Sequence, residues 1–151
     1  ADDTMGIYAT RYTGNMIVSP DKDMRQIPGK LYNFDDVFTV SKEDGAKWHL
    51  IQTMAGDQTD GYKGLEGVGV KRATTLFEEK GYSWKTVVDA FQEKGYTQVT
   101  ALANAQLARI LTVDDYDFKR KQPILWHPTP NYRIDSATGS KAKTTRDTVK
   151  S

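Results

Sequence analysis

Two aspartates in the middle of the chain have the spacing of a shared metal site. Asp57 and Asp60 lie three residues apart, and a glycine-rich segment, residues 64–69, follows them just before Lys71 and Arg72. Carboxylates at this spacing can bind one hard cation together. Backbone amides at a glycine turn that opens a helix can bind a phosphate group. A metal site next to a phosphate-binding turn indicates chemistry on a phosphodiester.

Two more pairs of aspartates occupy the ends of expected elements upstream. Asp2 and Asp3 begin an expected helix, and Asp21 and Asp23 directly follow an expected strand. Open α/β sheets place their ligand sites beyond the carboxyl ends of strands. Carboxylates from all three pairs in one basin would repel strongly unless divalent cations neutralised them. Mg²⁺ prefers carboxylate and water oxygens, with Mn²⁺ as a substitute, and two ions about 4 Å apart can activate water and stabilise a leaving oxygen.

Each of these patterns also has an ordinary structural interpretation. Aspartates commonly cap helices and form turns, which explains any single pair at least as well as a metal does. A glycine-rich segment can be a simple helix–helix connection that needs positive φ. Three acidic pairs beside residues 64–71 favour metal binding and a helix–hairpin–helix, in which amides, Lys71 and Arg72 would contact phosphates without reading base sequence. A monovalent cation bound by carbonyls of this turn is a further possibility.

Composition and charge describe one ordinary domain. The chain has 151 residues, 38% hydrophobic and 27% charged, with a formal net charge of +1. This charge is too small to predict a nucleic-acid partner, so that prediction rests on local placement alone. The absence of cysteine excludes disulfides and thiolate zinc sites. Neither a membrane-length apolar run nor a signal-peptide pattern is visible, and we therefore expect a cytoplasmic protein.

The patterning predicts an α/β front half followed by an all-helical back half. Strands are expected over residues 15–19, 30–33 and 37–40, the first of them buried, and helices over 2–12, 41–55, 70–80, 83–95 and 97–111. The helix over 97–111 carries large apolar residues, among them Val99, Leu102 and Leu107. Residues 124–126 are expected to form a docking strand, and residues 140–151 a flexible basic tail.

The order of these motifs resembles the 5′-nuclease (flap endonuclease) family, most closely the bacteriophage 5′–3′ exonucleases and the nuclease domain of bacterial DNA polymerase I. The resemblance covers roughly residues 1–126 and rests on Asp2 and Asp3, residues 19–23, residues 56–60 and residues 64–73, in that order. It implies a PIN-like or Rossmann-like nuclease sheet followed by a helix–hairpin–helix that grips duplex DNA and holds K⁺. It further implies catalytic roles and binding of two Mg²⁺ ions for Asp2, Asp3, Asp21, Asp23, Asp57 and Asp60. The duplex anchor that it implies consists of Gly67, Val68, Gly69, Val70, Lys71 and Arg72.

The resemblance also divides the chain and defines what it lacks. Residues 1–60 would complete the nuclease core, 61–112 would bind DNA, 113–130 would be an extended docking segment and 131–151 a tail. Family members carry a glutamate before the alanine that begins this chain, and further aspartates, a catalytic lysine or arginine and a threading arch upstream. We therefore expect a carboxyl-terminal half that needs an amino-terminal half as its partner and acts on duplex DNA with a 5′ end or flap, in the host cytoplasm if phage-encoded. The alternative is a DNA-binding or partner-binding module that does not cut.

Overall fold

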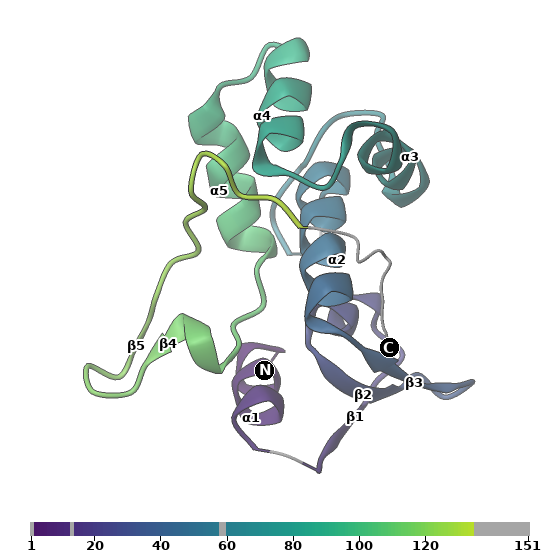
Figure 1. Cartoon of the computed structure of the whole chain (residues 1–151), viewed down its shortest axis with the longest axis vertical. Coiled ribbons are helices and arrows are strands. Elements are labelled where there is room, and N and C mark those ends of the chain that lie inside the picture. The colour runs from purple at the N-terminus through teal and green to yellow at the C-terminus, as the bar shows by residue number, and fades with distance from the viewer. Residues whose placement is uncertain (1, 13, 58–59, 135–151) are drawn as a thin grey trace, which may run out of the picture.

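The computed structural model describes residues 2–12, 14–57 and 60–134, with the exception of the side chains of Asp2 and Lys22. Helix α2 (Lys42–Ala55) runs through the middle of the molecule. A small sheet and helix α1 (Asp2–Arg11) lie at one end of α2, and the later helices gather at the other end (Figure 1). The predicted mixed α/β fold is confirmed, although the back half also contains a short two-stranded sheet and is not all-helical.

The sheet has three short strands in the order β1-β2-β3. Strand β1 (Met16–Val18) pairs in parallel with β2 (Gly29–Tyr32), and β2 pairs antiparallel with β3 (Val37–Val40). The 3₁₀ helix η1 (Lys22–Gln26) makes the crossover from β1 to β2. The three predicted strands are therefore confirmed.

The prediction that β1 is a buried strand was wrong. Only Ile17 is buried, while the Met16 and Val18 side chains remain 45% and 50% exposed. The reason is topological, because among the described strands β1 has a neighbour on one edge only. An interior parallel strand would be covered on both faces.

Helix α2 begins and ends at residues with clear local signals. The Ser41 hydroxyl accepts a hydrogen bond from the Asp44 amide at 3.0 Å, which satisfies a free amide of the first turn. Gly56 ends the helix at a φ of +75°, which glycine adopts without strain. Leu50 and Met54 are fully buried, and α2 packs against α3, α5 and η1.

The helical half consists of α3 (Val70–Lys80), α4 (Trp84–Glu93) and α5 (Gln98–Ala108). Val99 and Leu107, two of the large apolar residues of α5, are 77% and 59% exposed. Helix α5 instead turns small residues toward the core, namely Ala101, Asn104, Ala105 and Ala108. Small side chains allow α5 and α2 to approach closely, and this contact overrides the larger apolar residues.

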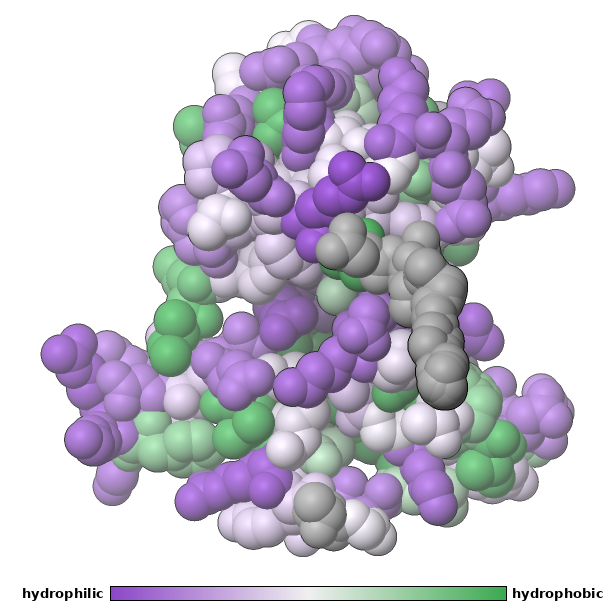
Figure 2. Space-filling model, viewed as in Figure 1, coloured by the Kyte–Doolittle hydropathy of each residue, from purple (hydrophilic) through white to green (hydrophobic). Residues whose placement is uncertain are grey.

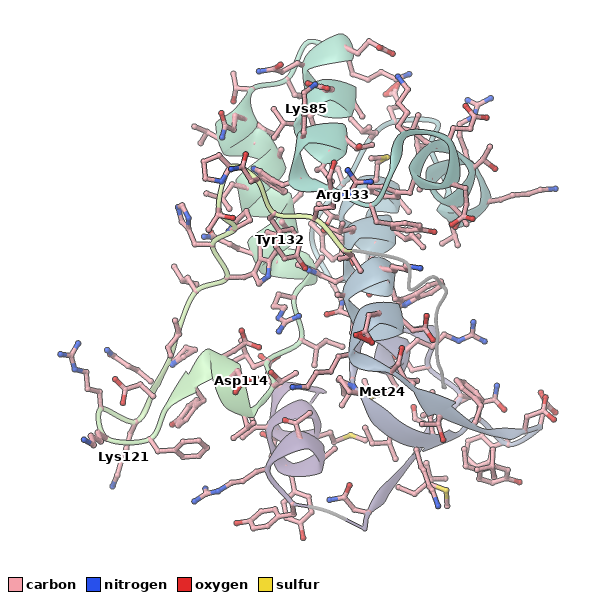
Figure 3. The ribbon with its side chains drawn as sticks, viewed as in Figure 1. Met24, Lys85, Asp114, Lys121, Tyr132 and Arg133 are labelled. Atoms are coloured by element: carbon pink, nitrogen blue, oxygen red, sulfur yellow. The ribbon has the colours of Figure 1, made fainter. Side chains whose placement is uncertain are left out.

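The chain beyond α5 forms a short hairpin and then returns to the helical half. The 3₁₀ helix η2 (Val113–Asp115) leads into β4 (Tyr116–Asp117), which pairs with β5 (Gln122–Pro123). The returning segment is tied to the helices where the Tyr132 carbonyl accepts a hydrogen bond from the Trp84 amide at 2.9 Å (Figure 3).

The predicted docking strand over residues 124–126 is absent. Ile124 and Leu125 are 50% and 68% exposed, because strand pairing in this segment stops at Pro123. Trp126 does dock, with its ring edge-on to those of His49 and Trp84 at centroid distances of 4.7 and 5.5 Å. The predicted tail over residues 140–151 lies outside the described residues.

Candidate metal centre

Three of the predicted acids converge on one site. Asp23 from η1, Asp57 just after α2 and Asp60 from the following turn each offer a carboxylate oxygen, and these oxygens lie within 4.8 Å of one another. Two or three carboxylates at such separations form a suitable oxygen ligand set for a small divalent cation. Residues remote in sequence have thus been brought together by packing η1 against α2.

Local backbone pairing holds Asp57 and Asp60 in place. The Asp57 amide donates to the Tyr62 carbonyl at 2.8 Å, and the Tyr62 amide donates back to the Asp57 carbonyl at 3.2 Å. The Leu65 amide donates to the Met54 carbonyl at 2.8 Å, which fastens the glycine-rich segment to the end of α2. These bonds fold the chain into a closed loop whose two carboxylates face η1.

Asp23 is held by the short helix that carries it. The Asp21 carboxylate caps η1 by accepting a hydrogen bond from the Asp23 amide at 2.9 Å. The Asp23 carboxylate, which is only 6% exposed, accepts a hydrogen bond from the Gln52 side-chain amide on α2. Met24, the next residue in η1, is fully buried and lies beside α2 (Figure 3).

The electrostatics of this site favour a cation. Burial, followed by the negative charges of Asp21, Asp60 and Asp57, raises the pKa of Asp23 to about 6. Burial, followed by the negative charges of Asp23, Asp57 and Asp60, also raises the pKa of the Tyr62 hydroxyl. Both shifts have the sign expected where negative charge is crowded without compensation. A divalent cation would remove that cost.

The other predicted acids have different positions. Asp21 lies beside Asp23 but is not one of the three converging groups. The Asp3 carboxylate accepts a hydrogen bond from the Leu111 amide at 3.0 Å, so the structure does not bring it into the group. The Asp2 side chain lies outside the described part of the chain. Metal binding by Asp2, Asp3 and Asp21 stays a prediction.

The predicted duplex anchor is exposed at the start of α3. Gly67 has a φ of +78°, and Gly69 caps α3 without a side-chain hydrogen bond, so the amides of the first turn face outward. Lys71 and Arg72 are exposed beside Gly69 and line a surface hollow of about 580 Å³. This arrangement matches what phosphate binding requires, while DNA contact by residues 67–72 stays a prediction.

A large cavity lies elsewhere. This cavity, of about 960 Å³, is lined by Thr10, Lys30, Arg109 and Asp115 among others, and none of the three converging acids borders it. In Figure 2 the surface is hollowed between the helical half above and the sheet and α1 below. The acids, rather than this cavity, therefore define the candidate centre.

Buried polar residues that support the site were missed in the sequence. Gln52 lies within a run of buried residues on α2, and Gln26 is buried in η1. Asn104 accepts a hydrogen bond from the Gly64 amide at 2.9 Å and so ties the glycine-rich segment to α5. The available signal was weak: Gln52 follows the apolar residues Leu50 and Ile51 and precedes Met54 by two positions.

Comparison with known proteins gives the family. No family model matches the chain. The chain is 28% identical to the "Exodeoxyribonuclease" of Enterobacteria phage T3 and 27% identical to the "Exonuclease" of Escherichia phage T7, in each case over 84% of this chain and 55% of the relative. It is also 32% identical to a "5'-3' exonuclease" of Streptomyces coelicolor, over 54% of this chain and 33% of that protein. These matches support a 5′–3′ exonuclease family for the chain.

The chain spans about half the length of the phage relatives it matches. The names of the relatives support a nuclease, and the sequence-based family prediction is confirmed. No helix in the described ranges combines the length and the apolar character that crossing a membrane would need.

Proposed function

We propose that this exonuclease chain supplies metal-binding and duplex-binding parts to an enzyme that hydrolyses phosphodiesters at the 5′ end or flap of duplex DNA. The observation that carries the proposal is the convergence of Asp23, Asp57 and Asp60. A site built to contact phosphate alone has no use for crowded carboxylates, because they repel the substrate.

In this proposal the chain's own residues bind and orient. Asp23, Asp57 and Asp60 would hold one Mg²⁺, or Mn²⁺ in its place, and Asp21, Asp2 and Asp3 would contribute to a second ion. Bound Mg²⁺ would supply an activated water and stabilise charge on the leaving oxygen. Lys71, Arg72 and the amides of residues 67–70 would hold the uncut duplex by its phosphates, with K⁺ bound at the turn.

The assignment of parts follows the predicted division. Residues 1–60 would belong to a PIN-like nuclease core, residues 61–112 to a helix–hairpin–helix region, and residues 113–130 to a docking segment. The matched region covers 55% of each phage relative, which is consistent with further chain completing the site. We propose that this further chain is an amino-terminal half.

One observation favours a second candidate, a module that binds DNA or a partner without cutting. The Asp3 carboxylate is engaged by the Leu111 amide, so the chain itself assembles only part of the expected acidic site. In that case the chain would bind DNA or a partner protein, and adding an amino-terminal half would not produce cleavage.

Metal titration tests the proposal directly. Calorimetry with Mn²⁺ should show binding to the wild-type chain that is lost when Asp57 and Asp60 are both replaced by alanine. The matched control replaces Asp35 and Asp36, an exposed pair in the β2–β3 connection, and should bind as the wild type does. An unchanged titration in the Asp57 and Asp60 variant would refute the metal site. Cleavage of a 5′-flap duplex by the chain, with and without an amino-terminal half, then separates the two candidates.

A further inference from the structure

Two buried glutamines connect the acidic group to the end of α5. The Gln52 side-chain amide donates a hydrogen bond to Asp23 Oδ1, and Gln52 Oε1 accepts one from Gln26 Nε2 at 2.6 Å. Gln26 Nε2 also donates to the Ala108 carbonyl at 2.5 Å, and Gln26 Oε1 accepts from the Ile110 amide at 2.9 Å. Gln52 and Gln26 are only 3% and 2% exposed. We call these two side chains the glutamine relay.

The relay has one possible direction. An ionised carboxylate only accepts hydrogen bonds, so Gln52 must present its NH₂ group to Asp23. The remaining oxygen of Gln52 then needs a donor, which fixes the NH₂ group of Gln26 toward it. The oxygen of Gln26 in turn needs a donor, and the Ile110 amide provides it. Each amide is oriented by the next, and the last contacts are backbone groups that cannot rotate.

We propose that Gln52, held by Gln26, is a positioning residue that fixes Asp23 as a cation ligand; this inference rests on the proposed metal-binding function. Asp23 sits on a 3₁₀ helix of five residues, which by itself gives its carboxylate little support. Gln52 uses one of the roughly four lone-pair sites that a carboxylate offers, and a side-chain hydrogen bond with Asp60 engages Asp23 in the metal-free chain, so sites remain for a cation. Partners that orient a metal-binding carboxylate typically contribute about 10–100-fold to metal affinity.

The relay also joins the cation site to the helical half. The Ala108 carbonyl is among the last of α5, where helix carbonyls lack partners within the helix, and Gln26 supplies a donor. A cation that tightens Asp23 therefore changes the environment of Gln52, Gln26 and the Ile110 amide in sequence.

Substitution of Gln52 tests the inference by metal affinity rather than by cleavage. Gln52→Met keeps the length and approximate volume of the side chain but removes the donor, and should weaken Mn²⁺ binding by about tenfold or more in calorimetry. Thr53→Val is the matched control, since Thr53 is equally buried on α2 but its hydroxyl donates only to the His49 carbonyl at 2.8 Å. The control should stay within about twofold of wild type, the change expected for a site without a link to the metal.

A double-mutant cycle separates positioning from general damage to α2. In a background of Asp23→Asn, adding Gln52→Met should not weaken the residual Mn²⁺ binding any further. The reason is that Gln52 acts on the metal only through the Asp23 carboxylate, which this background lacks. Equal losses in both backgrounds would overturn the positioning role.

Side-chain amide signals give a readout that needs no substitution. On Mg²⁺ addition, the NH₂ signals of Gln52 and Gln26 and the Ile110 amide signal should shift in a ¹⁵N-correlated spectrum. Gln106 is the internal control, because its NH₂ group donates to the Trp126 carbonyl at 3.1 Å outside the relay. Two results would overturn this inference alone. One is Mn²⁺ binding at the acids while the relay signals do not shift on Mg²⁺ addition. The other is Mn²⁺ binding to Gln52→Met with the affinity of the wild type. Mn²⁺ binding that is unchanged when Asp57 and Asp60 are both replaced by alanine would overturn the proposed function, and this inference with it.

Discussion

Gly56 and Gly64 lie backbone against backbone at the end of α2. Their φ values are +75° and +62°, and a Cβ atom built on Gly64 would lie 2.6 Å from the Met54 carbonyl oxygen and 2.7 Å from the Ala55 carbonyl carbon. Both positions therefore require glycine for conformation and for space. This contact closes the loop that carries Asp57 and Asp60.

Gly64→Ala should unfold this loop or the whole chain. The added methyl group meets rigid backbone, and we expect a loss of more than about 3 kcal/mol in the free energy of unfolding, because strain and overlap add together. Gly67→Ala is the matched control, since its φ of +78° is also positive but a Cβ there meets nothing within 4 Å. Urea unfolding should give a cost of about 1 kcal/mol for the control. Equal costs at the two positions would contradict the packing argument.

Asp23→Asn should stabilise the metal-free chain at pH 7. The folded-state pKa of Asp23 is raised from 3.8 to about 6, so its contribution to stability is present below pH 3.8 and is lost as pH rises through 6. At pH 7 the variant avoids a buried charge, and we expect a gain of roughly 2 kcal/mol. Saturating Mg²⁺ should reverse the order, since the variant binds it poorly. Thermal unfolding with and without Mg²⁺ measures both effects, with the exposed Asp35→Asn as the control for net charge.

His49 should make the chain sensitive to acid. Burial, followed by the positive charge of Arg109, lowers the pKa of His49 to about 4, although the hydrogen bond to the Ala105 carbonyl and the charge of Asp115 oppose the shift. A lowered folded-state pKa means that stability is present above the unfolded value of 6.5 and is lost as pH falls toward 4. Between pH 7 and pH 5 the free energy of unfolding should fall by about 2 kcal/mol because of His49.

The comparison that isolates His49 uses a variant that does not titrate. Urea unfolding of His49→Gln at pH 7 and pH 5 should lack this loss, whereas His127→Gln at an exposed position should keep it. The contribution of Asp23 to the free energy of unfolding changes in the opposite direction over this pH range. It is the same in the wild type and in both variants, so it cancels in the comparison. A loss of stability in His49→Gln as large as in the wild type would refute the assignment.

Replacing Lys71 and Arg72 together by alanine should weaken duplex binding on any sequence. If both side chains contact phosphates, the slope of log affinity against log salt should fall by about 2, because fewer counterions are released. The control replaces Lys85 and Lys94, two exposed lysines on and after α4. It makes the same change in net charge away from α3. Fluorescence anisotropy over a salt series would detect the difference, and equal slopes in the two variants would argue against the anchor.

Local signals in the sequence predicted the elements well. Ser41, Ser83 and Thr97 each cap the helix that they were expected to begin, and Gly81 ends α3, because capping depends on a few neighbouring residues. The buried face of α5, by contrast, could not be predicted from the sequence. Which face is buried there depends on how closely α2 approaches, and no residue within α5 encodes that distance.

The candidate site was predictable in part. Asp23, Asp57 and Asp60 were identified because their spacing and order carry a family pattern, and the structure brings those three together. The glutamine relay was not predictable, since its bonds join η1, α2 and the end of α5. Hydrogen bonds over such sequence separations follow from tertiary packing alone.

The one-sided pairing of β1 has a consequence for handling the protein. Among the described strands β1 forms hydrogen bonds only with β2, so its other edge has no neighbouring strand. The side chains of Met16 and Val18 add exposed apolar surface beside this edge. Such a border is a template onto which any extended peptide can add, including the same strand of another molecule. In concentrated solution we therefore expect chains to aggregate by pairing of β1 strands from different molecules. A segment that paired with β1 would extend the sheet and would also prevent this aggregation.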